Sequence, residues 1–138
     1  MKKIALSLLT LIMIFSLASC FGAKPVGEWG TVSYSEDTTL GKGAKTAVVE
    51  IVTEEKTVTI TLKTDEEILG KALAAENLIA GEDGAYGLYI KEVNGVAADY
   101  DADQTYWAFY IDGEFAMTGV DSTPIEEGKI YRLSKEKG

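Results

Sequence analysis

Hydrophobic and polar positions alternate along two neighbouring segments in the middle of the chain. Every second residue is apolar between positions 57 and 63, where threonines fill most of the positions between, and a similar alternation runs through positions 47–52. A period of two is typical of strands with one buried face. The polar sequence Glu54-Glu55-Lys56 separates the two segments. The pattern therefore predicts a β-hairpin with one face in the core.

A helical period follows this hairpin. Apolar residues recur at helical spacing from Ile68 to Ala75. Thr64 and Glu67 have the spacing of a capping box, in which both side chains accept hydrogen bonds from free backbone N–H groups at the start of a helix. Acidic residues at this end also suit the helix dipole. We predict a helix that begins after Thr64, ends near Asn77 and covers the buried face of the hairpin.

The second half of the chain is again strand-like. Asn94-Gly95 and Asp112-Gly113 are dipeptides typical of two-residue hairpin turns. Further strands are predicted at positions 86–90, 105–111, 115–117 and 130–133. Two strands, a helix and then several strands indicate an α+β fold. We predict a β-grasp-like, mixed sheet of about five strands with one helix packed across it, and a small β-sandwich is the alternative.

The N-terminal segment has the pattern of an export signal. Lys2 and Lys3 precede an uncharged apolar run, Ile4–Leu17, that is short for a membrane span. The following residues, Leu17-Ala18-Ser19-Cys20, are similar to the lipobox of bacterial lipoproteins. That resemblance implies that a signal peptide of residues 1–19 is removed and that Cys20 receives the lipid. We expect a chain anchored on the outer face of a cell membrane, in a Gram-positive envelope.

A stalk is predicted between the lipid and the globular domain. Residues 20–45 are rich in glycine and polar residues and have no sustained period, whereas residues 46–138 carry the patterned segments. Trp29, Val32 and Tyr34 are the apolar exceptions in the stalk. We expect them either to add a short strand or to pack on the domain.

Composition and charge exclude several classes of function. The formal net charge is −9, and loss of the signal peptide with its two lysines makes the mature chain more acidic, so nucleic acid is not an expected partner. The chain has no histidine, and Cys20 is its only cysteine. Histidine-based catalysis and free-thiol chemistry are therefore excluded, and the sequence has no phosphate-binding or dinucleotide-binding fingerprint. We expect a protein that is not an enzyme and requires no cofactor or metal.

Three alternating aspartates deserve comparison with a calcium loop. Asp99, Asp101 and Asp103 match the first three ligand positions of an EF-hand. Gln104 and Tyr110 stand where that loop needs glycine and glutamate. A solvated acidic loop is the favoured interpretation, and an improvised calcium site is the alternative.

Aromatic residues are concentrated in the strand predicted at positions 105–111. Alternation places Trp107 and Phe109 on the core face, and Tyr106 and Tyr110 on the open face together with Tyr89 from a neighbouring strand. Tyrosine combines an apolar ring with a hydroxyl, which suits a partly wet binding surface. Tyr89, Tyr106 and Tyr110, with Trp107 from the same strand, are therefore the candidate ligand-binding residues. The alternative is a stripe that only tolerates solvent or packs under the stalk.

Most of the globular part resembles the transcobalamin-like C-terminal domain of bacterial surface lipoproteins. The resemblance covers roughly Thr46 to Leu133 and rests on Tyr86-Gly87-Leu88-Tyr89-Ile90, Val93-Asn94-Gly95-Val96, Tyr106-Trp107-Ala108-Phe109-Tyr110-Ile111-Asp112-Gly113, Thr118-Gly119-Val120-Asp121 and the segment 128–133. It implies a β-grasp fold and a non-catalytic module that captures cobalamin or another corrinoid. In the animal proteins a large helical domain, without a counterpart in this sequence, supplies the other half of the cobalamin site. The alternative is a protein-interaction or cell-surface adhesion module that uses the same face or a sheet edge.

Overall fold

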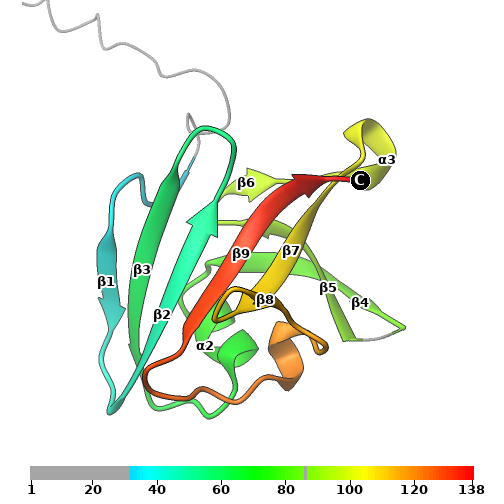
Figure 1. Ribbon diagram of the computed structural model, residues 1–138. Coiled ribbons are helices and arrows are strands. Elements are labelled where there is room, and N and C mark those ends of the chain that lie inside the picture. The colour runs from blue at the N-terminus through cyan, green and yellow to red at the C-terminus, as the bar shows by residue number, and fades with distance from the viewer. Residues whose placement is uncertain (1–31, 86) are drawn as a thin grey trace, which may run out of the picture. The chain divides into compact units, whose positions relative to one another are not determined.

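The computed structural model describes residues 32–85 and 87–138 (Figure 1). Their elements are β1 (Thr38–Gly41), β2 (Lys45–Val52), β3 (Thr57–Thr64), α2 (Leu69–Ala75), β4 (Ile79–Gly84), β5 (Gly87–Val93), β6 (Val96–Ala97), α3 (Tyr100–Asp103), β7 (Thr105–Ile111), β8 (Glu114–Phe115), the 3-10 helix η3 (Val120–Ser122) and β9 (Ile130–Lys137). They form a six-stranded mixed sheet in the order β1-β3-β2-β9-β7-β8 and a three-stranded sheet in the order β4-β5-β6. The predicted α+β class with a mixed sheet is confirmed. The signal peptide and Cys20 lie outside the described residues.

The predicted central hairpin is confirmed. β2 pairs antiparallel with β3, and Val49 lies opposite Ile60. The alternating apolar residues of both strands are almost fully buried. β9 joins the other side of β2 in parallel, where Tyr131 and Leu133 extend the same buried face. Period-two patterning thus determines which face of the larger sheet meets the core.

The core also includes residues from outside the larger sheet. Leu69 and Leu73 of α2 and Val93 of β5 are fully buried together with the inner face of β2, β3 and β9. β5 lies next to β7, which brings the smaller sheet against the larger one (Figure 1). Residues 31–138 form one compact unit. Because this unit contains its own core, it can be studied by itself.

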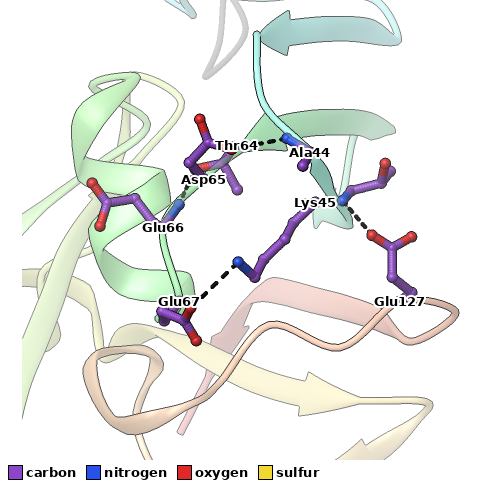
Figure 2. A network of polar contacts seen from close by, with 8 residues as sticks. Ala44, Lys45, Thr64, Asp65, Glu66, Glu67 and Glu127 are labelled. Carbon is purple, nitrogen blue, oxygen red and sulfur yellow. Dashed lines mark hydrogen bonds and ion pairs between the residues drawn. The ribbon is translucent and has the colours of Figure 1, made fainter.

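The predicted capping box at the start of the helix is wrong. Thr64 Oγ1 accepts a hydrogen bond from the backbone N–H of Glu66 at 3.0 Å, within a local turn. Glu67 Oε2 instead pairs with Lys45 Nζ (Figure 2), and the two atoms are 3.4 Å apart. In the same network, Asp65 Oδ1 accepts from the Ala44 N–H at 3.0 Å. These side chains therefore tie the β3–α2 connection to the start of β2 and do not cap the helix.

The helix begins at Leu69 because a distant segment satisfies its first donor. The Leu69 N–H donates to the Thr123 carbonyl at 2.8 Å. Ile68 is extended (φ −112°, ψ 132°) and forms a β-bridge with Pro124. A long-range backbone contact thus replaces the local cap that the sequence favours, since either one satisfies a free N–H.

The predicted end of the helix is confirmed. Asn77 adopts a left-handed conformation with φ 58°. The Leu78 N–H donates to the Leu73 carbonyl at 2.9 Å, and the Asn77 N–H donates to the Ala74 carbonyl at 3.0 Å. This pair of bonds is the Schellman arrangement, in which asparagine is one of the few residues that tolerate the left-handed position.

Both predicted hairpin turns are also confirmed. Asn94 and Gly95 have φ values of 54° and 85°, and Asp112 and Gly113 have φ values of 52° and 85°. Two consecutive positive values define the type I′ turn that matches the twist of adjacent strands. The first turn joins β5 to β6, and the second joins β7 to β8.

The segment expected as a stalk contributes to the fold. β1, within it, pairs in parallel with β3 at one edge of the larger sheet. Tyr34 packs on the domain, where its backbone bonds the side chain of Asn94; Trp29 lies outside the described residues. A strand of four residues is too short to show a period in the sequence. Its place in the sheet depends on its parallel pairing with β3. Within the ranges 32–85 and 87–138, no helix has the length and apolar character needed to cross a membrane.

Candidate ligand-binding groove

Trp107 belongs to the core, as alternation along the strand predicts. It is 8% exposed, and Phe109 on the same face stacks on Tyr131 with ring centroids 6.4 Å apart. The Trp107 Nε1 is buried and has no hydrogen-bond partner in the described part of the chain. Its ring therefore packs in the core, and Trp107 does not lie on the open face with the candidate ligand-binding tyrosines.

Tyr110 lies on the open face but is already engaged. Its hydroxyl donates to Glu136 Oε2 at 2.8 Å, and its ring makes a T-shaped contact with that of Phe115 at a centroid distance of 5.7 Å. The hydrogen bond to Glu136 raises the pKa of the Tyr110 hydroxyl above its usual value, with further contributions from desolvation and from the carboxylate charge. Because its hydroxyl is bound to Glu136 and its ring contacts Phe115, we assign Tyr110 a structural role.

Tyr89 does not join Tyr106 and Tyr110 in one stripe. It lies on β5, in the smaller sheet, opposite Glu82 of β4. The neighbours of β7 are β8 and β9, so the expected tyrosine stripe on one sheet face does not form. Tyr89 nevertheless remains accessible, with 44% of its surface exposed.

A fourth tyrosine contacts the ring of Tyr106 and lines the same hollow as Tyr89. Tyr100 is the first residue of α3 and is 47% exposed. Its ring centroid lies 6.5 Å from that of Tyr106. Tyr100 also lines a hollow of about 310 Å³ together with Tyr89, Lys91, Ala98, Asp99 and Asp101. The expected solvated loop is instead the short helix α3, and the signal for it in the sequence is Asp99, a residue type that favours the helix N-cap.

A second hollow adjoins this one along β5. It has a volume of about 390 Å³ and shares Lys91, Ala98 and Asp99 with the first. Its other lining residues are Ala80, Gly81, Glu82, Glu92 and Ala97. We call the two hollows together the β5–α3 groove. Volumes of a few hundred Å³ are typical of sites for small molecules.

Lys91 lies where the two hollows meet. Its Nζ is 3.4 Å from Glu82 Oε2 and 5.9 Å from the centroid of the Tyr89 ring. The ammonium group is thus held between a carboxylate and the face of a ring. Both contacts are on the surface, where water screens the ion pair and limits its contribution to stability.

The alternating aspartates organise the helix beside the groove. Asp99 Oδ1 accepts the Asp101 N–H at 3.1 Å as the N-cap of α3. Asp103 accepts the Thr105 N–H at 3.1 Å, and its bond from the Thr105 hydroxyl contributes most to a pKa below the usual aspartate value. Among the residues described, no three acidic, histidine or cysteine side chains are grouped so that they could hold a metal ion.

An exposed apolar area lies at the end of β8. Phe115 is 64% exposed, Met117 is 93% exposed, and Ile130 is also exposed. We call these three residues the β8 patch. A hollow of about 380 Å³ beside it is lined by Ile111, Asp112, Glu114, Phe115, Ala116 and Lys129. Exposed large apolar side chains often mark contacts with other proteins.

Comparison with known proteins identifies relatives of the described domain. The family model for a domain of unknown function, DUF4430, matches residues 53–130. A solved structure of a candidate metal-binding protein from Ruminococcus gnavus ATCC 29149 is 33% identical, with a TM-score of 0.65, over 69% of this chain and 99% of that protein. Haptocorrin in complex with Cbi is 20% identical, with a TM-score of 0.48, over 71% of this chain and 27% of haptocorrin. No curated protein matches the sequence significantly.

Proposed function

Starting from a chain that belongs to the DUF4430 family, we propose that it is a non-catalytic binding module on the outer face of the cell membrane. The lipid on Cys20 would hold it there, as the lipobox-like sequence implies. The β5–α3 groove would hold the ligand. A binding role suits a chain without histidine, the side chain that most often transfers protons in catalysis, and with its single cysteine proposed as the lipid acceptor.

The observation that carries this proposal is the pair of accessible rings that line the groove. Tyr89 and Tyr100 come from different elements, and each leaves nearly half of its surface exposed beside the same hollow. Rings that stay exposed in this way offer apolar contact area and a hydroxyl at once. A small molecule with a flat or alkylated body would cover both rings.

A corrinoid is the specific ligand that we propose to test, since the sequence resembles the transcobalamin-like domain. The groove is far smaller than a whole corrinoid, so it would hold one edge or one side arm and leave the rest accessible. Such partial contact agrees with a module that covers one face of its ligand. The protein has no histidine to coordinate cobalt, so rings and hydrogen bonds would make the contact.

A metal ligand is a weaker proposal, although the R. gnavus relative is described as a candidate metal-binding protein. Hard cations need several oxygen ligands around one point. The described ranges contain no acidic cluster of that kind, and two of the three alternating aspartates, Asp99 and Asp103, accept backbone hydrogen bonds. We therefore favour an organic ligand.

Calorimetric titration of residues 31–138 with cobalamin tests the proposal. The double variant Tyr89→Leu/Tyr100→Leu should bind at least about tenfold more weakly than wild type, because buried aromatic contacts contribute most of the free energy at such surfaces. Phe115→Leu is the control, since it removes another accessible ring, on β8, that does not line the groove. Undiminished binding by the double variant, or a loss confined to Phe115→Leu, would contradict the proposed site.

A protein-interaction or adhesion module remains the second proposal, and the β8 patch favours it. Phe115 and Met117 expose a larger fraction of their surface than Tyr89 and Tyr100 of the groove. Under this alternative, pull-down with surface proteins of the source cells should fail for Phe115→Ser and persist for the double tyrosine variant.

A further inference from the structure

We propose that Asp121 is a positioning residue for the β5–α3 groove, because it holds the start of β5 and with it the Tyr89 ring that lines the groove. This inference rests on the proposed function and deepens it, since it assigns a role in ligand binding to a residue that does not itself line the groove. Three observations support it: the bond that Asp121 makes to β5, the close fit of its carboxylate, and the contact of η3 with the helix α2.

The start of β5 has a strand on one edge and a side chain on the other. Leu88 lies opposite Asp83 of β4. β6 pairs with the far end of β5, at Glu92 and Val93, and leaves the Leu88 position without a second strand in the described sheet. Asp121 Oδ2 accepts the Leu88 N–H at 3.1 Å. A carboxylate from η3 thus bonds a backbone donor that would otherwise be left to water at the edge of the sheet.

Two glycines leave room for this carboxylate. A β-carbon at Gly87 would lie 2.9 Å from Asp121 Oδ2, and one at Gly119 would lie 3.0 Å from Asp121 Oδ1. Gly87 also has a φ of 109°, which residues with a side chain rarely adopt. The Asp121 carboxylate therefore fills a defined space between η3 and the start of β5.

Tyr89 follows Leu88 directly, and its backbone is restrained from two sides. On the β4 side, the Tyr89 carbonyl fills the space that a β-carbon at Gly81 would need. On the η3 side, the bond to Asp121 holds the preceding residue. η3 in turn packs against α2, where a β-carbon at Gly70 would lie 2.9 Å from the Asp121 Cα. Asp121 therefore links the position of Tyr89 to a helix that belongs to the core.

A ring that is held in place favours binding, because the ligand does not have to order it. Ordering a segment or a side chain on binding costs free energy, and a preorganised site avoids much of that cost. Tyr89 is 44% exposed, so the packing around its ring restrains it less than burial would. The backbone of β5 therefore largely determines where the ring lies, and Asp121 helps to fix that backbone.

Asp121→Ala and Asp121→Asn test this role in residues 31–138, with Asp37→Ala as the matched control. Asparagine keeps an oxygen that can accept the Leu88 N–H, whereas alanine removes it. Asp37 makes the same kind of contact on the larger sheet, where its Oδ1 accepts the Thr59 N–H at 2.9 Å. In calorimetric titration, Asp121→Ala should bind cobalamin about fivefold more weakly than wild type, the effect of one hydrogen bond. Asp121→Asn and Asp37→Ala should bind it as wild type does.

A second measurement needs no ligand. In ¹⁵N relaxation, the backbone order parameter at Tyr89 should fall in Asp121→Ala from about 0.85, typical of a rigid backbone, toward about 0.6, and should keep its wild-type value in Asp37→Ala. Urea unfolding of the same variants provides the comparison with stability. A merely structural role would lower the unfolding midpoint of both alanine variants and leave the affinity and the Tyr89 order parameter unchanged.

The outcomes distinguish this inference from the proposed function. Wild-type affinity in Asp121→Ala, an equal loss in Asp37→Ala, or no recovery in Asp121→Asn would overturn the positioning role. The groove would remain the binding site in each case if Tyr89→Leu/Tyr100→Leu still lost affinity for cobalamin. If wild type did not bind cobalamin, or if the double tyrosine variant bound it equally well, the proposed function would fail and the positioning role would fail with it.

Discussion

Asn94 offers the sharpest test of how the segment just before β1 is attached to the sheet that carries the groove. Its side chain is fully buried at the β5–β6 turn. Asn94 Oδ1 accepts the Tyr34 N–H at 2.9 Å, and Asn94 Nδ2 donates to the Tyr34 carbonyl at 2.8 Å. One amide therefore pairs with both backbone groups of Tyr34, as a neighbouring strand would.

The expected loss in unfolding free energy when Asn94 is replaced follows from these two bonds and from the backbone conformation. Each hydrogen bond contributes about 1 kcal/mol net, so Asn94→Gly, which tolerates the positive φ of 54°, should cost about 2 kcal/mol. Asn94→Ala loses the same bonds and keeps a β-carbon in the left-handed region, which alanine tolerates less well than asparagine or glycine; this adds about 1 kcal/mol relative to Asn94→Gly. The difference between the two variants isolates the conformational contribution.

Urea unfolding of residues 31–138 measures both values. A loss of about 2 kcal/mol corresponds to a fall in Tm of about 10 °C for a domain of this size. Asp112→Gly is the matched control at the other type I′ turn, where the exposed carboxylate accepts one bond from the Ile130 N–H; it should cost about 1 kcal/mol or less. An Asn94→Gly midpoint equal to wild type would refute the reasoning, because the buried amide would then contribute nothing.

Three further predictions concern the anchor, the core and acid stability. Cys20→Ser should leave the membrane fraction in cell fractionation, because it lacks the expected lipid acceptor; membrane association equal to wild type, after uncleaved precursor is subtracted, would contradict the anchor. Trp107→Ala should cost on the order of 3–5 kcal/mol in urea unfolding, and an unchanged midpoint would place this ring outside the core. The hydrogen bond from the Thr105 hydroxyl lowers the pKa of Asp103 and favours its charged form in the folded state. This interaction stabilises the fold above about pH 4, the usual aspartate pKa, and its contribution is lost as pH falls through the folded-state pKa. Wild type should therefore exceed Asp103→Asn in stability at pH 7, and the difference should shrink as pH falls through the folded-state pKa of Asp103; a difference that stays constant with pH would contradict this.

The features that the sequence predicted well depend on local chemistry. Alternation located β2 and β3, and the dipeptides at Asn94-Gly95 and Asp112-Gly113 located both hairpin turns. Asn77 marked the end of α2 for a similar reason, since few other residues accept its conformation. In each case the residues that determine the structure are adjacent in the chain, so the sequence pattern was sufficient.

Features decided by distant contacts were missed or wrongly placed. The capping box at Thr64 failed because the Thr123 carbonyl satisfies the helix start. β4 went unrecognised, since nearly all its residues are exposed and a bulge at Ala80/Gly81 interrupts its pairing. That strand pairs with β5 and so places Tyr89 in the smaller sheet. The groove was therefore visible only after the pairing of the strands and the position of Tyr100 were known.

Residue-by-residue mapping of a cobalamin titration by NMR tests the central proposal most directly. With ¹⁵N-labelled residues 31–138, we predict saturable amide shifts that centre on Tyr89, Lys91 and the start of α3, and that disappear in the Tyr89→Leu/Tyr100→Leu variant. Shifts that instead centre on Phe115 and Met117, or a spectrum that cobalamin leaves unchanged, would contradict the proposal that the β5–α3 groove is the ligand-binding site of this domain.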